Sequence, residues 1–212
     1  YNKKDYAEAL KYYSQLEKVT SHPETIYNTR VGLMRCEFLL NNWEEAILYA
    51  NKVLSNSLVV SSIRIEAEYS RGIAYFRNNQ FEQAKAPLEW LTKNTTNIIA
   101  SESRYYLAEM NYTQKNYNAA EADIWTLLKM KPSFDFWIAK GLILQTRVLI
   151  AKPDLFQAEH TLKSVIDNYK LKDDNILLEV NPLWDELMQI KNMPKSTIDT
   201  NTNVIEIKEK WE

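Results

Sequence analysis

The sequence predicts an all-α fold in which antiparallel helix pairs stack on one another, about four and a half repeats followed by a C-terminal capping helix. Three observations lead to this prediction. A short motif recurs at a nearly constant interval, each interval holds two amphipathic helical patterns, and strand patterns are almost absent. The chain has 212 residues, of which 45% are hydrophobic, so it is long enough to bury a continuous core.

The recurring motif consists of a polar residue, a large apolar residue, two variable positions and an alanine. It reads DYAEA at 5–9, NWEEA at 42–46, QFEQA at 80–84, NYNAA at 116–120 and DLFQA at 154–158. Its last residues, which we call the repeat alanines, are Ala9, Ala46, Ala84, Ala120 and Ala158. They are separated by 37, 38, 36 and 38 residues, and an interval held this closely indicates a repeated supersecondary unit.

Each interval contains two helices with apolar stripes near a period of 3.6 residues. In the second interval the stripe of the first helix consists of Tyr27, Val31, Met34 and Phe38. The stripe of the second helix consists of Trp43, Ala46, Ile47, Ala50 and Leu54. The first helices are expected at about 23–40, 58–77, 97–114 and 134–151.

Capping signals mark where these helices begin. Ser21 with Glu24 is a capping box before a first helix, and Asn42, Asn79 and Asp154 are each followed three residues later by Glu or Gln. Pro87 is the exception, because it lies inside the expected helix 80–93. It should remove one backbone hydrogen bond and bend that helix, or move its start to a later residue.

These signals divide the chain into a helical array over 1–190 and a polar linker and tail over 191–212. The array comprises a partial repeat at 1–20, repeats at 21–56, 57–95, 96–132 and 133–170, and a capping helix at 173–190. The helix at 3–18 carries the second-helix motif with no first helix before it, so we expect the segment to belong to a longer array. Its exposed face and the tail, where 204–211 alternates like a short strand, are where self-association could occur.

One repeat carries a more specific pattern. Gly72, Tyr75, Phe81 and Ala84 follow one another as small residue, tyrosine, aromatic and alanine, and Pro132 follows the fourth repeat. In this the chain resembles the tetratricopeptide repeat (TPR) family over roughly 3–169. The intervals are longer than the usual repeat, Met34 takes the small position of the second repeat, and Leu155 replaces the aromatic of the fifth. Armadillo or HEAT helix pairs are the structural alternative, but they lack this pattern.

The resemblance implies a right-handed superhelix whose first helices line a concave groove. Packing within repeats is assigned to Gly72, Tyr75, Phe81, Ala84 and the other repeat alanines, with glycine marking a close helix crossing at Ala84. In the turn after Gly72, Asn79 can adopt a left-handed backbone and cap the next helix. The groove residues implied by the repeat offsets are Asn28, Arg35, Phe38, Glu66, Tyr69, Phe76, Arg77, Glu102, Tyr105, Glu109, Tyr112, Lys140 and Arg147.

An aromatic groove with charges of both signs suits an extended peptide or a partner helix. The alternative interpretation is that Tyr69, Tyr105 and Tyr112 pack between repeats and that the charged residues pair with one another. For Trp43, Trp90 and Trp125 a core position is expected. Some TPR domains bind the terminal carboxylate of a partner in their groove. A ligand of that class is disfavoured here, because the negative charge of Glu66 would repel the carboxylate.

The predicted function is therefore a non-catalytic scaffold that binds a protein or peptide of unknown identity, with no cofactor and no metal. The long intervals and the stretches at 105–112 and 155–169 resemble bacterial cell-envelope TPR proteins. This resemblance implies a periplasmic or cell-envelope location. The alternative is a cytosolic regulatory TPR module attached to a signalling or transcription domain. An enzyme would need residues brought together from different repeats.

Other classes of function find little support in the composition. The net charge of −2 lacks the basic excess of nucleic-acid binders, and no apolar run reaches the length of a membrane span. His22 lies in a capping loop, His160 is expected on the surface, and Cys36 is expected as a buried structural thiol. No metal-ligand spacing and no phosphate-binding glycine loop occurs.

Overall fold

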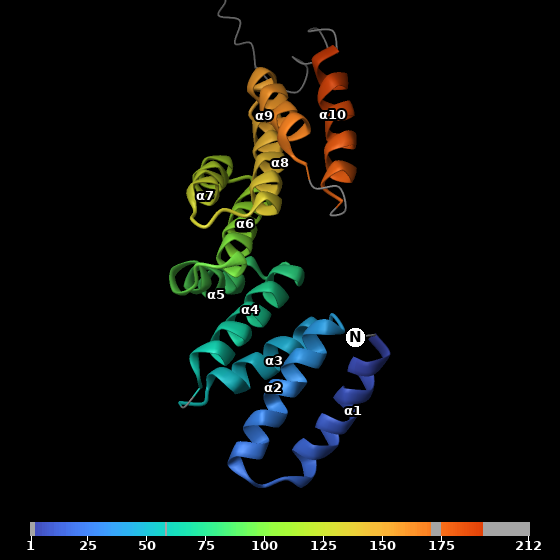
Figure 1. Ribbon diagram of the computed structural model, residues 1–212, viewed down its shortest axis with the longest axis vertical. Helices are drawn as coiled ribbons and strands as arrows, with labels where there is room; N and C mark the ends of the chain where they lie inside the picture. The colour runs from blue at the N-terminus through green and yellow to red at the C-terminus, as the bar shows by residue number, and fades with distance from the viewer. Residues whose placement is uncertain (1–2, 58, 171–174, 193–212) are drawn as a thin grey trace, which may run out of the picture.

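The part of the chain that the structure describes is built from helices alone. The computed structural model describes residues 3–57, 59–170 and 175–192 and has ten helices and no strand within them. The helices are α1 (Lys3–Val19), α2 (Pro23–Leu39), α3 (Trp43–Leu54), α4 (Ser61–Arg77), α5 (Phe81–Asn94), α6 (Ile98–Thr113), α7 (Tyr117–Lys129), α8 (Asp135–Ala151), α9 (Leu155–Asn168) and α10 (Ile176–Asn192). Each packs on the next, and Figure 1 shows them stacked in chain order from α1 to α10. The predicted all-α fold of successively packed helices is confirmed.

Helices two apart in the order also contact one another. We call α2, α4, α6 and α8 the first helices, and they contact each other in sequence, α2 with α4, α4 with α6 and α6 with α8. The helix α10 contacts both α8 and α9, so it occupies the place of one more first helix. Figure 1 shows it on the opposite side of the stack from α5 and α7. It buries its apolar stripe there, which consists of Ile176, Val180, Leu183 and Leu187.

The repeat alanines lie where the helices of a pair approach each other. Ala46, Ala84, Ala120 and Ala158 lie in α3, α5, α7 and α9, which we call the second helices, and each is 0% exposed. Ala9 is half-buried instead, because within the described residues α1 packs only on α2. An alanine at this position leaves room for the neighbouring backbone, which explains why the motif repeats it.

Gly72 is a close-packing position, although its neighbour differs from the expected one. A Cβ added there would lie 3.0 Å from Leu88 Cδ2 and 3.5 Å from Pro87 Cβ, both in α5. The expected partner, Ala84, is buried in the same helix but is not among the nearest contacts. The helix α5 runs through Pro87 and begins at Phe81, so the proline does not delay its start and instead places its ring against α4.

Sequence reasoning missed a second small position, which lies 17 residues before each of the last four repeat alanines. It is occupied by Thr29, Ala67, Ser103 and Gly141, all of them buried. At Gly141 an added Cβ would lie 3.0 Å from Leu127 of α7, the preceding second helix. Gly32 likewise faces backwards, since an added Cβ would lie 2.5 Å from Tyr13 Cζ in α1. Small residues thus permit close packing both within repeats and between them.

The helix starts agree with the capping signals at Asn42 and Asp154, but of the four predicted caps only Asp154 makes the side-chain capping bond. Asp154 accepts a hydrogen bond from the Gln157 backbone N–H, as expected. The N-cap of α2 is His22, not Ser21, because the helix begins with Pro23. Asn42 is the N-cap of α3, but its side chain donates to Glu37 and accepts no helix N–H. Asn79 has the expected left-handed backbone, with φ 57°, and Gln80 takes the N-cap position after it.

The largest apolar cluster lies in the middle of the stack and draws its buried residues from α4, α5, α6, α7 and α8. Its aromatic rings form a continuous series, with centroid separations of 4.6 Å for Phe76–Tyr106 and 5.4 Å for Tyr105–Trp137. The three tryptophans expected in the core differ from one another. Trp43 and Trp90 are half-buried, but Trp125 is 56% exposed on α7, so its core assignment was wrong.

Candidate functional site

The surface formed by α2, α4, α6 and α8 carries nearly all of the predicted groove residues, and we call it the first-helix surface. Asn28, Arg35 and Arg77 are exposed there. Those that are half-buried are Phe38, Glu66, Tyr69, Phe76, Glu102, Glu109, Tyr112, Lys140 and Arg147. Tyr105 is the exception, because it is only 3% exposed.

Tyr105 was expected on the groove and is a core residue. Its ring packs on Trp137 of α8 at 5.4 Å and on Tyr106 at 5.6 Å, and burial strongly raises its pKa. The neighbouring first helix therefore covers it. Sequence offsets alone could not separate the two environments, because position 105 is equivalent to position 69, where the tyrosine keeps some exposure.

An apolar hollow of about 190 Å³ opens on the first-helix surface at α2 and α4. Its lining residues are Met34, Arg35, Phe38, Leu39, Glu66, Tyr69, Ser70 and Ile99. Phe38 and Tyr69 form one wall, with ring centroids 5.7 Å apart, and Leu39 at the opening is 43% exposed. Four members, Met34, Leu39, Ser70 and Ile99, were not among the predicted site residues. These residues lie at helix ends or on apolar helix faces. The repeat offsets that were used to predict the groove residues did not select them.

The only charged side chains lining this hollow, Arg35 and Glu66, are bonded to each other. The Arg35 guanidinium donates to the Glu66 carboxylate at 2.7 Å, and both side chains remain exposed, at 49% and 43%. An exposed pair of this kind stabilises the fold by at most about 1 kcal/mol. Glu66 is therefore neutralised in place, and the hollow is apolar with one ion pair among its lining residues.

Further along the first-helix surface, charged groups gather over α6 and α8. The Lys140 ammonium donates to Glu179 of α10 at 2.7 Å and lies 5.2 Å from the centroid of Tyr105. The Arg77 guanidinium donates to the Tyr106 hydroxyl at 3.2 Å. Glu179 was not predicted, since it lies in a segment without the repeat motif.

Two carboxylates on the same face of α6 are held in an unfavourable environment. Burial raises the pKa of Glu102, although a hydrogen bond from Tyr69 and the charge of Arg77 act against that shift. Burial also raises the pKa of Glu109, and the charges of Lys140, Arg147 and Arg77 offset this only in part. Both groups would gain from additional hydrogen-bond donors.

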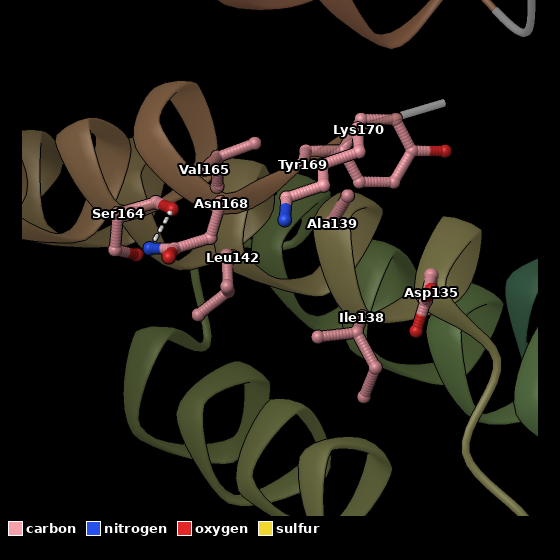
Figure 2. Close-up of a pocket in the computed structure, with 9 residues that line it drawn as sticks. All are labelled: Asp135, Ile138, Ala139, Leu142, Ser164, Val165, Asn168, Tyr169 and Lys170. Carbon is pink, nitrogen blue, oxygen red and sulfur yellow. Dashed lines mark hydrogen bonds between the residues drawn. The ribbon is translucent and has the colours of Figure 1, made fainter. Parts of the chain in front are cut away.

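A second hollow, of about 300 Å³, lies away from this surface between α8 and α9, and Figure 2 shows it. Ile138, Leu142 and Val165 contribute apolar side chains, and Asp135 and Lys170 contribute charges. The carboxamide of Asn168 already makes a hydrogen bond within its own helix, because it donates to the Ser164 carbonyl at 2.8 Å. Its polar groups do not converge on a common point, so it is the weaker candidate.

Catalytic and metal-binding groups are scarce in the described part of the chain. No group of three or more His, Cys, Asp and Glu residues there could hold a metal ion. Cys36 is buried, and burial raises its pKa, which disfavours the reactive thiolate. His160 is exposed and stacks on Phe156 at 4.5 Å. Among the described helices, none combines the length and apolarity needed to cross a bilayer.

The comparisons with known proteins add no relative. Family models, curated proteins and solved structures all fail to match the chain significantly.

Proposed function

We propose that this chain is a non-catalytic scaffold that binds an extended peptide segment of a partner protein on its first-helix surface. The observation that carries the proposal is the apolar hollow at α2 and α4. It is walled by aromatic rings, and Leu39 at its opening keeps 43% of its surface exposed. An open apolar hollow that leaves a large apolar side chain exposed is a usual form of a side-chain anchor site.

The size and chemistry of the hollow favour a peptide over a free small molecule. Its volume, about 190 Å³, is below the range of drug-sized ligand pockets and fits one bulky apolar side chain. The Arg35–Glu66 pair next to it can exchange hydrogen bonds with a main chain. The proposed ligand is therefore a peptide segment with one large apolar side chain. This side chain, and not a terminal carboxylate, occupies the hollow.

The resemblance to TPR proteins supports the same class of function, because such repeats present first-helix surfaces to partners. It rests on Gly72, Tyr75, Phe81 and Ala84 and on the recurring alanines. A location in the cell envelope is implied by that resemblance alone and stays a prediction, as does the alternative of a cytosolic regulatory module.

The experiment is a selection of displayed random heptapeptides on the purified chain, followed by affinity measurements with a labelled selected peptide. Leu39→Asp places a charge at the opening of the hollow and should weaken binding at least tenfold. Leu48→Asp is the matched control, since Leu48 is 45% exposed but lies on α3, outside the hollow. Equal losses in both variants, or no selected peptide at all, would count against the proposal.

A further inference from the structure

Glu109 and Arg147 occupy equivalent positions on neighbouring first helices. Each lies 11 residues before a repeat alanine, Ala120 or Ala158, and α6 and α8 are in contact. Both side chains are half-buried on the first-helix surface. Within the described residues, neither the carboxylate nor the guanidinium has a hydrogen-bond or ion-pair partner. This surface therefore presents one strong acceptor and one strong donor whose bonding capacity is unused.

Glu109 remains unpaired because Lys140, its counterpart across the junction, is bonded elsewhere. At the α2–α4 junction the corresponding side chains, Arg35 and Glu66, close an ion pair at 2.6 Å. At the α6–α8 junction the same two positions carry Glu109 and Lys140, with the charges reversed. Lys140 instead donates to both carboxylate oxygens of Glu179, at 2.7 and 2.8 Å.

The charges around this pair select against a charged ligand. Charged side chains of both signs gather here and nearly balance. They are Arg77, Lys140 and Arg147, and Glu102, Glu109, Glu179 and Glu186. A carboxylate that approached Arg147 would be repelled by Glu109, and an ammonium group that approached Glu109 would be repelled by Arg147. A neutral group that both donates and accepts would satisfy the two sites together.

A main-chain peptide group has this form. Its N–H and C=O point in opposite directions in the trans isomer. With ordinary bond lengths and two hydrogen bonds of about 2.9 Å, it can bridge a carboxylate oxygen and a guanidinium nitrogen about 8 Å apart. The axes of contacting helices are about 8–10 Å apart, which is of the same order as the length of this bridge.

We infer that Glu109 and Arg147 together bind a main-chain amide of the partner segment, whose N–H donates to Glu109 and whose C=O accepts from Arg147. The inference rests on the proposed function, since it names the part of the ligand that meets this surface. Ile99 at the hollow and Glu109 both lie in α6, about 15 Å apart at 1.5 Å per residue. An extended chain covers that distance in about five residues, so the amide lies about five residues from the apolar anchor.

The test uses the selected heptapeptide and a series of analogues, each methylated on one backbone nitrogen. Fluorescence polarisation measures their affinity for the unmodified chain. One analogue, methylated about five residues from the anchor, should bind at least tenfold more weakly. The parent peptide should lose about as much affinity for Glu109→Met and for Arg147→Met, and Glu109→Met should no longer distinguish that analogue from the parent. Glu44→Met, on the exposed start of α3, should bind normally.

The outcomes separate the two proposals. Equal affinity of all analogues for the unmodified chain would overturn the inference and leave the proposed function intact. The same holds if sensitivity to Glu109→Met or Arg147→Met disappears when a single acidic or basic side chain of the peptide is replaced by Ala. Because the analogues are measured on the unmodified chain, a variant that fails to fold does not remove the test.

Discussion

The α2–α4 and α6–α8 junctions use the same repeat positions and reach opposite electrostatic results. At α2–α4, Arg35 and Glu66 are paired and exposed beside an apolar hollow. At α6–α8, Glu109 occupies the position of Arg35, is half-buried and has no ion pair within the described residues. The difference arises from a third element, since α10 supplies Glu179 to Lys140.

This comparison shows that a repeat determines which positions meet but not which groups bond. At both junctions, the residue that lies 11 positions before one repeat alanine is near the residue that lies 18 positions before the next repeat alanine. The bond forms at α2–α4, where neither partner has a second ion pair within the described residues. At α6–α8 a helix without the repeat motif competes for the lysine. The two junctions can therefore serve different parts of one ligand, an apolar anchor at the first and a polar group at the second.

The largest expected difference between the junctions concerns their buried centres. Tyr105 is 3% exposed and Val31, at the equivalent position, is 5% exposed. Tyr105→Ala should lower the free energy of unfolding by about 3–5 kcal/mol, because it empties the centre of the aromatic cluster. Val31→Ala should cost about 1–2 kcal/mol. Chemical denaturation measures both values, and equal losses would show that the two junctions are packed alike.

The next largest effect concerns Lys140, which donates to Glu179 of α10. Lys140→Met leaves the half-buried Glu179 without its ion-pair partner and should cost about 1–2 kcal/mol, between the values for exposed and buried pairs. Arg35→Met at the other junction should cost less than about 1 kcal/mol, because its pair is exposed. Thermal unfolding compares the two variants. A larger loss for Arg35→Met would contradict the role assigned to α10.

A smaller effect is expected at Glu109, where a substitution should raise the stability of the fold instead of lowering it. Its pKa is raised in the folded state, so the folded chain holds this proton more tightly than the unfolded chain does. The stability linked to this group is fully present below the unfolded pKa and is lost as the pH rises through the folded pKa. At neutral pH, Glu109→Gln should therefore raise the melting temperature, and the gain should shrink on acidification.

The matched control for that prediction is Glu66→Gln, which breaks an existing pair. It should lower the melting temperature slightly or leave it unchanged at neutral pH. A melting temperature that rises equally in both variants would show that the gain at Glu109 is not specific to its unpaired carboxylate.

The smallest effect belongs to an exchange of charges at α2–α4. The double variant Arg35→Glu/Glu66→Arg keeps an ion pair in reversed order, so the free energy of unfolding should change by less than about 0.5 kcal/mol. Each single change places like charges together and should cost more than the pair. A double-mutant cycle gives the coupling, and the absence of any coupling would mean that the observed bond contributes nothing.

The helices and most of the first-helix surface were predictable, because they depend on local and periodic properties. The interval between repeat alanines located the helix pairs, and Phe38, Glu109 and Arg147, selected by the repeat offsets, keep part of their surface exposed. The capping signals were less reliable. Ser21 lost the N-cap position to His22, since the following Pro23 is favoured in the first turn of a helix.

The errors concern residues whose surroundings come from another repeat. Tyr105 and Tyr69 are the same residue type at the same offset, yet Trp137 covers only the first of them. Trp125 follows the helical period and remains 56% exposed, because no second layer covers that face of α7 in the described part of the chain. Leu39 and Ile99 line the hollow because the last turn of α2 and the first turn of α6 both border it.

The sequence by itself determined the helical repeat and the buried alanines Ala46, Ala84, Ala120 and Ala158, because these follow from a period that local contacts enforce. Only the tertiary structure decided which of the equivalent side chains are open, paired or left with unused bonding capacity. Such outcomes depend on side chains from distant segments competing for one partner, as Glu179 does for Lys140. A periodic pattern carries no information about a competitor that lies outside the period.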